Sequence, residues 1–110
     1  MNSQFKKGVL ELCVLAVVAK QDVYGYELVQ QISESINITD GTIYPLLRRL
    51  TAEGYFVTYL QESAAGPPRK YYRITEAGRE QLKTLLEDWT EFTAGVSRLL
   101  ANSREGVNNG

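Results

Sequence analysis

The feature that most restricts how this chain can fold is an apolar repeat in its last third. From Leu82 to Leu99, apolar residues recur in alternating steps of three and four, which is the spacing of a coiled-coil seam. The seam consists of Leu82, Leu85, Trp89, Phe92, Val96 and Leu99, with Leu86 beside it. A helix over residues 75–100 would be about 38 Å long at about 1.5 Å per residue, too long to lie wholly on its own small domain. The repeat therefore predicts a long helix whose seam packs against a second copy of the chain.

The first helix, predicted over residues 5–20, also has apolar surface that must be buried against another part of the protein. It is apolar on nearly every side, because only Glu11 interrupts the run from Val9 to Ala19. A helix of this kind is buried on more than one side. One small domain covers one side, so we expect the other, including Leu12, to pack against the long helix in a homodimer.

Two shorter helices are predicted between these elements. In the first, running from Tyr24 to Ile36, apolar residues recur every fourth residue. The second follows Thr39, a suitable N-cap, and ends at Gly54, a suitable C-cap. Its apolar stripe is Ile43, Leu46, Leu47 and Leu50. Two helices joined by a short turn form a helix-turn-helix pattern, although any three-helix bundle shares it.

A β-hairpin is predicted directly after these helices. Residues 55–60 and 70–74 are rich in aromatic and β-branched residues, and the segment between them contains Gly66, Pro67 and Pro68. A β-hairpin that directly follows a helix-turn-helix is called a wing. The sequence thus predicts a mainly α fold with a small β-hairpin. Its parts are a winged helix-turn-helix domain over residues 1–74, a dimerisation helix over 75–100 and a disordered tail over 101–110.

Three segments of the chain resemble the signature blocks of PadR-type regulators, and they occur in the family's order. They are residues 24–27 (YGYE), 41–50 (GTIYPLLRRL) and 66–75 (GPPRKYYRIT). The resemblance covers residues 5 to about 100. A single C-terminal helix is similar to the smaller PadR-like subgroup, which includes a multidrug-responsive regulator of lactic acid bacteria. The resemblance implies a bacterial or archaeal repressor that acts as a homodimer, often with a small-molecule inducer.

The residue types in these blocks suit DNA recognition. If the stripe of the third helix is buried, Gly41, Tyr44 and Arg48 lie on its outer face. Glycine permits close approach of a phosphate backbone, a tyrosine hydroxyl can bond a phosphate, and arginine can reach phosphate or guanine. The expected contacts to double-stranded DNA are Lys6, Tyr24, Thr39, Gly41, Thr42, Tyr44, Arg48, Arg69 and Lys70. The alternatives are a cap for Thr39, a core position for Tyr24 and a merely solvated surface for the whole face.

The charge of the chain is distributed unevenly. A formal net charge of -1 does not by itself indicate a nucleic-acid partner. Residues 39–74, however, hold five basic and three acidic side chains, whereas residues 75–110 hold four basic and six acidic ones. A local basic patch is what phosphate binding requires. Lys6 and Lys7, at the start of the first helix, are further candidates for backbone contacts.

Trp89 has two interpretations. The first is packing in the core of the dimer, as aromatic seams do in general. The second comes from the resemblance, since a tryptophan at the same distance past the Tyr-Tyr-Arg block holds flat aromatic drugs between two subunits of the lactic acid bacterial regulator. The position four residues later is acidic there and is Thr93 here. A preference for cationic ligands is therefore not implied.

Three classes of function are open to a chain of this kind: a DNA-binding repressor, a winged-helix protein-interaction module without DNA binding, and an enzyme. The chain has no histidine and a single cysteine, Cys13, inside an apolar run. No metal site, cofactor or catalytic constellation is expected from this composition. The expected partners are double-stranded DNA, a second copy and an aromatic effector. A lone cysteine and an apolar run shorter than a bilayer span favour a cytoplasmic protein without a membrane segment.

Overall fold

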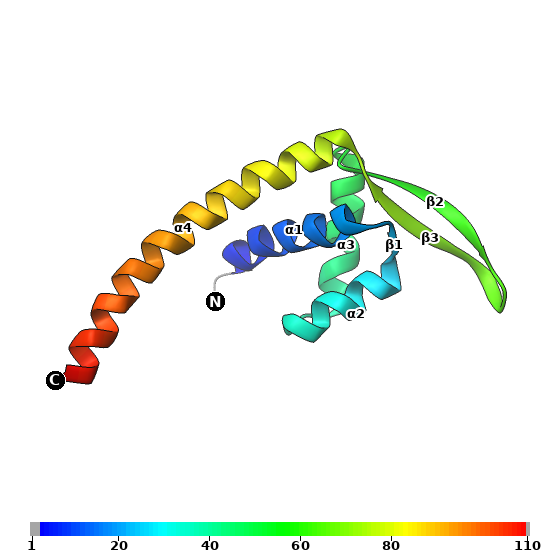
Figure 1. Ribbon diagram of the computed structural model, residues 1–110. Coiled ribbons are helices and arrows are strands. Elements are labelled where there is room, and N and C mark those ends of the chain that lie inside the picture. Colours follow the sequence, from blue (N-terminus) through cyan, green and yellow to red (C-terminus); the bar gives the residue numbers. More distant parts are fainter. Residues whose placement is uncertain (1–2, 110) are drawn as a thin grey trace.

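The computed structural model describes the backbone of residues 3–109 and the side chains of residues 7–101. Its elements in chain order are α1 (Ser3–Lys20), β1 (Val23–Tyr24), α2 (Gly25–Ser35), α3 (Asp40–Ala52), β2 (Phe56–Ser63), β3 (Gly66–Ile74) and α4 (Glu76–Asn109). The first three helices pack together, the β2–β3 hairpin projects to one side of them, and α4 extends to the other (Figure 1). This is the predicted winged helix fold with one long C-terminal helix.

The core lies where the three helices meet the base of the sheet. Its fully buried side chains include Leu15 of α1, Leu28 of α2 and Phe56 of β2. The stripe predicted for α3 is confirmed, because Ile43, Leu46, Leu47 and Leu50 are all buried. The helix ends at Ala52, and the glycine predicted to close it, Gly54, follows the C-cap Glu53 with a φ of 88°, the left-handed conformation that favours glycine. Burial of one face of α3 leaves the opposite face exposed.

The sheet has three strands rather than the two that were predicted. Their order is β1-β3-β2, and all neighbours are antiparallel. Tyr24, predicted as the first residue of a helix, is the last residue of β1 and pairs with Tyr71. It has an extended backbone (φ -91°, ψ 156°), and α2 begins one residue later at Gly25. A strand of two residues is too short to show an alternating pattern, which explains why it was missed.

The hairpin is longer than predicted. Part of the segment expected to be a loop is paired, since Gln61 lies opposite Arg69 and Ser63 opposite Gly66. Pro67 and Pro68 lie in β3 beyond the reach of β1, where β3 has a partner on one side only. A missing N–H is tolerated at such an edge. The wing is therefore a projecting ribbon with a short turn at its tip.

Helix α4 begins as predicted, with Thr75 as its N-cap. The Thr75 hydroxyl accepts a hydrogen bond from the Gly78 N–H at 3.0 Å and lies 2.7 Å from the Gly54 carbonyl oxygen. The helix continues to Asn109, past the end predicted at residue 100, so the backbone of 101–109 is helical where a disordered tail was expected. No proline occurs between Ala101 and Asn109, and the single glycine there, Gly106, does not end the helix.

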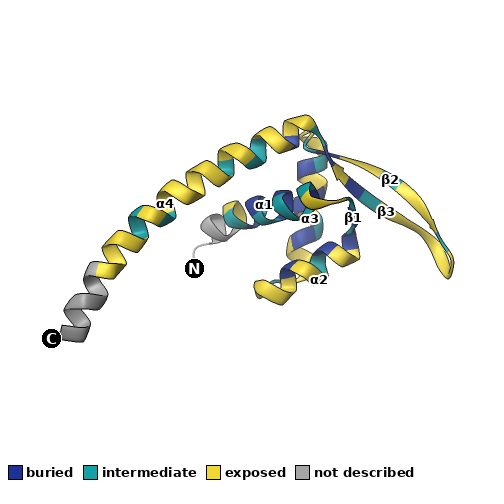
Figure 2. Ribbon diagram, in the orientation of Figure 1, coloured by how far each residue is buried: buried dark blue, intermediate teal, exposed yellow. Residues whose placement is uncertain are grey.

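Much of α4 is exposed, as the ribbon coloured by burial shows (Figure 2). Leu82 and Leu85 pack against the core, but the seam beyond them is open. Its large exposed side chains are Leu86, Trp89, Phe92 and Leu99, with Leu100 nearby. Leu12, expected at the dimer interface, is already buried by its own chain. None of the described helices is long and apolar enough to span a bilayer.

Candidate nucleic-acid interface

The outer face of α3, opposite its buried apolar stripe, carries the residues that were predicted to lie there. Gly41, Pro45 and Arg48 are exposed, and Tyr44 is half-buried at one flank. Within the described part of the chain, Arg48 has no ion pair or hydrogen bond. Its neighbour Arg49 differs, because it donates to Glu11 at 3.2 Å and to Glu53 at 2.9 Å. Arg49 thus ties α3 to α1, while the Arg48 guanidinium is available to a ligand.

Gly25 gives room to the ring of Tyr44. It is buried at the start of α2, and a Cβ at this position would lie 2.9 Å from Cε1 of the Tyr44 ring. A separation below 3.0 Å forces a shift, so the Tyr44 ring occupies its place because residue 25 has no side chain. Gly25 was not predicted as a site residue. The only sign of this role in the sequence is a glycine in the first turn of a predicted helix, where glycine is otherwise unfavourable.

A cleft of about 370 Å³ lies between α3 and the wing, and we call it the wing cleft. It is lined by Tyr24, Gly25, Tyr26, Tyr44, Arg48, Lys70 and Tyr72. Burial raises the pKa of Tyr72, and the neighbouring Tyr44 raises it further, so the Tyr72 phenol keeps its proton at neutral pH. The cleft therefore combines two cations with phenol donors, which is a suitable environment for a phosphate group.

The adjacent basic residues Arg69 and Lys70 of the wing face in different directions. Arg69 and Lys70 are adjacent in β3, and neighbouring residues of a strand point to opposite faces. The Lys70 ammonium lies 5.9 Å from the centre of the Tyr72 ring, and Lys70 lines the wing cleft. The Arg69 guanidinium lies 4.7 Å from the centre of the Tyr24 ring and does not line the cleft. Lys70 thus shares a ligand space with Arg48, and Arg69 does not.

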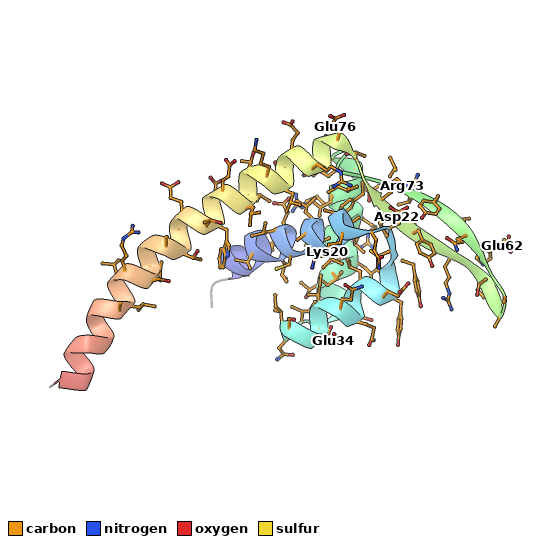
Figure 3. All side chains as sticks on the ribbon, viewed as in Figure 1. Lys20, Asp22, Glu34, Glu62, Arg73 and Glu76 are labelled. Atoms are coloured by element: carbon orange, nitrogen blue, oxygen red, sulfur yellow. The ribbon has the colours of Figure 1, made fainter. Side chains whose placement is uncertain are left out.

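Three tyrosine rings lie side by side on the other face of the sheet. The Tyr71 ring lies between Tyr24 and Tyr59, with centroid distances of 5.7 and 5.5 Å. Asp22 accepts hydrogen bonds from the Tyr59 hydroxyl at 2.7 Å and from Arg73 Nε at 3.0 Å, and Figure 3 shows Asp22 beside Arg73. The hydrogen bond from Tyr59 and the Arg73 guanidinium lower the pKa of Asp22. The wing is therefore anchored to the link between α1 and β1.

The remaining predicted contacts lie near the start of α3 or outside the described side chains. Thr39 occupies the N-cap position, but its hydroxyl makes no capping bond and lies 3.3 Å from the Thr42 hydroxyl. Both threonines are exposed. The side chain of Lys6 lies outside the described residues, so its predicted contact stays a prediction.

Comparison with known proteins identifies the family. Residues 14–84 match the sequence model of the Transcriptional regulator PadR-like family. The chain belongs to this family. The PadR-like match runs from the last part of α1 to the first part of α4 and includes α3 and the wing. The predicted resemblance is thereby confirmed, and the chain is a PadR-like transcriptional regulator rather than an enzyme.

Individual relatives agree with this assignment. A transcriptional regulator of Mycobacterium tuberculosis is 34% identical over 104 residues, which cover 90% of this chain and 96% of that protein. A PadR-like transcriptional regulator from Bacillus cereus superimposes with a TM-score of 0.80 at 40% identity, over 88% of this chain and 96% of the other. Bacillus subtilis PadR in complex with operator DNA superimposes with a TM-score of 0.64, at 24% identity and over 71% of this chain and 46% of that one. At this identity the last likeness shows a shared fold only.

The PadR-like chain has a second hollow away from α3, between α1 and α4. It measures about 280 Å³ and is lined by Gly8, Val9, Leu12, Leu85, Asp88, Trp89 and Phe92. We call it the Trp89 hollow. Its walls are mainly apolar, with Asp88 as the one charged lining residue among the described side chains. The Thr93 hydroxyl bonds to the Trp89 carbonyl oxygen of its own helix at 2.8 Å.

Proposed function

We propose that this PadR-like regulator binds operator DNA as a cytoplasmic homodimer and represses transcription by occupying the promoter. The observation that carries the proposal is the wing cleft, where Arg48 and Lys70 face one space beside the phenols of Tyr44 and Tyr72. With α3 in the major groove, the wing extends over the adjacent backbone, and a phosphate between them enters this cleft. Bacillus subtilis PadR, which has the same fold, forms a complex with operator DNA, and this supports operator binding as the function.

The dimer is inferred from apolar surface that one chain leaves open. Leu86, Phe92 and Leu99 lie exposed along α4, beyond the part of the helix that packs on its own core. Contiguous exposed apolar surface of this kind marks an interface with another molecule. A two-fold axis that pairs the α4 helices covers this surface, and Leu82, Leu85, Trp89 and Val96 complete the seam. The same axis places two α3 helices on one side of the dimer for two half-sites.

The Trp89 hollow is the proposed site of a planar aromatic effector. Its apolar walls and its indole suit a flat ring system, and it lies between α1 and α4, the helix that carries the proposed dimer seam. An effector in the hollow would change the angle between α1 and α4 and thus the spacing of the two α3 helices. DNA affinity falls by linkage if the effector prefers the spacing that does not match the operator.

Substitutions in the wing cleft test DNA binding. We expect Arg48→Ala to lower operator affinity by about 10- to 100-fold and to relax base preference at one position in each half-site, because arginine reads a base edge. Lys70→Ala is expected to weaken all duplexes alike and to reduce the slope of log affinity against log salt by about one per subunit. Fluorescence anisotropy titrations of labelled duplexes at several salt concentrations measure both effects.

Arg79→Ala is the matched control, since Arg79 is an exposed arginine at the start of α4, outside the wing cleft. We expect this variant to bind like the unmodified protein. If Arg48→Ala and Lys70→Ala also bind normally, the wing cleft is not a DNA site. The alternative of a winged-helix protein-interaction module then becomes the better explanation.

Trp89 is the sole tryptophan, so its fluorescence reports on the proposed effector site without a label. We expect planar aromatic dyes to quench this fluorescence saturably and to lower operator affinity by about 5- to 150-fold, the usual range of coupling between two sites. Trp89→Ala should keep DNA binding but lose the release by dye. Saturable quenching with unchanged DNA affinity would mean that the hollow binds dyes without regulating the protein.

A further inference from the structure

The flank of α3 that faces away from the wing carries another hollow, between the first half of α3 and the start of α1. It measures about 370 Å³ and is lined by Lys7, Leu10, Gly41, Thr42, Pro45, Leu46 and Arg49. We call it the α1 cleft. Leu10 and Leu46 are buried and form its apolar floor, while Lys7, Thr42 and Arg49 are exposed. Helix α3 is thus bordered by a cleft on each flank.

Only one cation of the α1 cleft is free to meet a ligand. The Arg49 guanidinium is held by two carboxylates, Glu11 at 3.2 Å and Glu53 at 2.9 Å. Lys7 has no ion pair or hydrogen bond to any part of the chain that the structure describes. Glu11 lies one turn from Lys7 on α1, but its carboxylate is already engaged by Arg49. The charge that the cleft offers is therefore the Lys7 ammonium.

The dimensions of the duplex decide what each cleft meets. An α-helix with its side chains is about 10–12 Å across, and the major groove of B-DNA is about 12 Å wide. A helix in that groove therefore fills it, and its two flanks face the backbones of the two different strands. Tyr44 and Arg48 lie on the flank of the wing cleft, while Thr42 and Arg49 lie on the flank of the α1 cleft.

We infer that the α1 cleft receives a backbone phosphate of the strand opposite to the one bound in the wing cleft. Lys7 supplies the cation, the Thr42 hydroxyl donates a hydrogen bond, and the apolar floor packs against the deoxyribose. This inference rests on the proposed function, because it applies to a duplex seated on α3. It assigns one strand to each flank of α3, so the two strands are held by separate residues of one subunit.

The experiment uses the full-length protein and a duplex selected from a random-sequence library by repeated rounds of binding. Single methylphosphonate linkages, which remove one phosphate charge each, are placed in turn along both strands. For the unmodified protein we expect two groups of sensitive positions in each half-site, one on each strand. Lys7→Gln should lower affinity by about 3- to 10-fold and the salt slope by about one per subunit, and should abolish sensitivity on one strand. Lys70→Gln should abolish sensitivity on the other strand.

Lys20→Gln is the control for loss of a lysine charge from α1, because Lys20 is exposed at the opposite end of that helix (Figure 3). It should leave both groups of sensitive positions intact. The inference is overturned if Lys7→Gln leaves the affinity and the scan unchanged while Lys70→Gln alters them, and the proposed function then stands. It is also overturned if both variants lose sensitivity on the same strand. If neither variant changes binding, the proposed function fails together with the inference.

Discussion

Gly78→Ala is expected to lower the stability of the fold by about 2–4 kcal/mol, although alanine stabilises most helices relative to glycine by about 1 kcal/mol. A Cβ at Gly78 would overlap the carbonyl oxygen of Tyr55 and lie 2.7 Å from Cγ1 of Ile74. The Tyr55 carbonyl cannot move away from the new Cβ without losing the hydrogen bond that it accepts from the Thr75 N–H at 3.0 Å. The first turn of α4 would therefore be pushed away from the sheet.

Thermal unfolding followed by circular dichroism measures this effect. A loss of about 2–4 kcal/mol corresponds to a decrease in Tm of roughly 10 °C or more for a domain of this size. Gly41→Ala is the control, because a Cβ there meets only the Thr39 hydroxyl oxygen at an ordinary distance of 3.6 Å. We expect that variant to be as stable as the unmodified protein or slightly more stable. A Gly78→Ala protein that unfolds at an equal or higher temperature would show that α4 is not seated as closely as described.

The sequence predicted those parts of the fold that repeat along the chain. The stripe of α3 and the cap at Thr75 are local patterns, and the structure confirms both. The outward position of Arg48 followed from the same periodicity, since a helix with one face buried must expose the opposite one. The predicted family follows from blocks of residues in order, and the family match confirms it.

What the sequence did not predict depends on contacts between distant segments. Nothing local shows that Gly25 gives room to Tyr44, or that Gly78 gives room to Tyr55. Adjacent arginines differ in role because Arg49 meets Glu11, which lies in another helix. The short strand β1 exists because the edge of β3 is open beside it, and two residues show no periodicity of their own. These features are determined by tertiary contacts between segments that are far apart in the sequence.

The largest effect on DNA binding is expected from Leu99→Asp, which places a carboxylate in the seam of α4. Leu99 is 70% exposed in the single chain, so the substitution leaves the fold of one subunit intact. In the proposed dimer the same position is buried against the partner, where an unpaired carboxylate is strongly unfavourable. The dimer should dissociate at micromolar concentration. Because two linked half-sites bind more tightly than one, operator affinity should fall by about 100-fold or more.

Ser97→Asp is the matched control, since it adds the same charge two residues away on the opposite side of α4, where Ser97 is exposed. Light scattering gives the mass in solution, and anisotropy titrations compare an operator of two half-sites with a single half-site. We expect Leu99→Asp to be a folded monomer that binds both duplexes with the same low affinity, while Ser97→Asp stays dimeric and prefers the full operator. A Leu99→Asp protein that remains dimeric and keeps full affinity would place the interface elsewhere than on the α4 seam. The coiled-coil spacing from Leu82 to Leu99 would then need another partner.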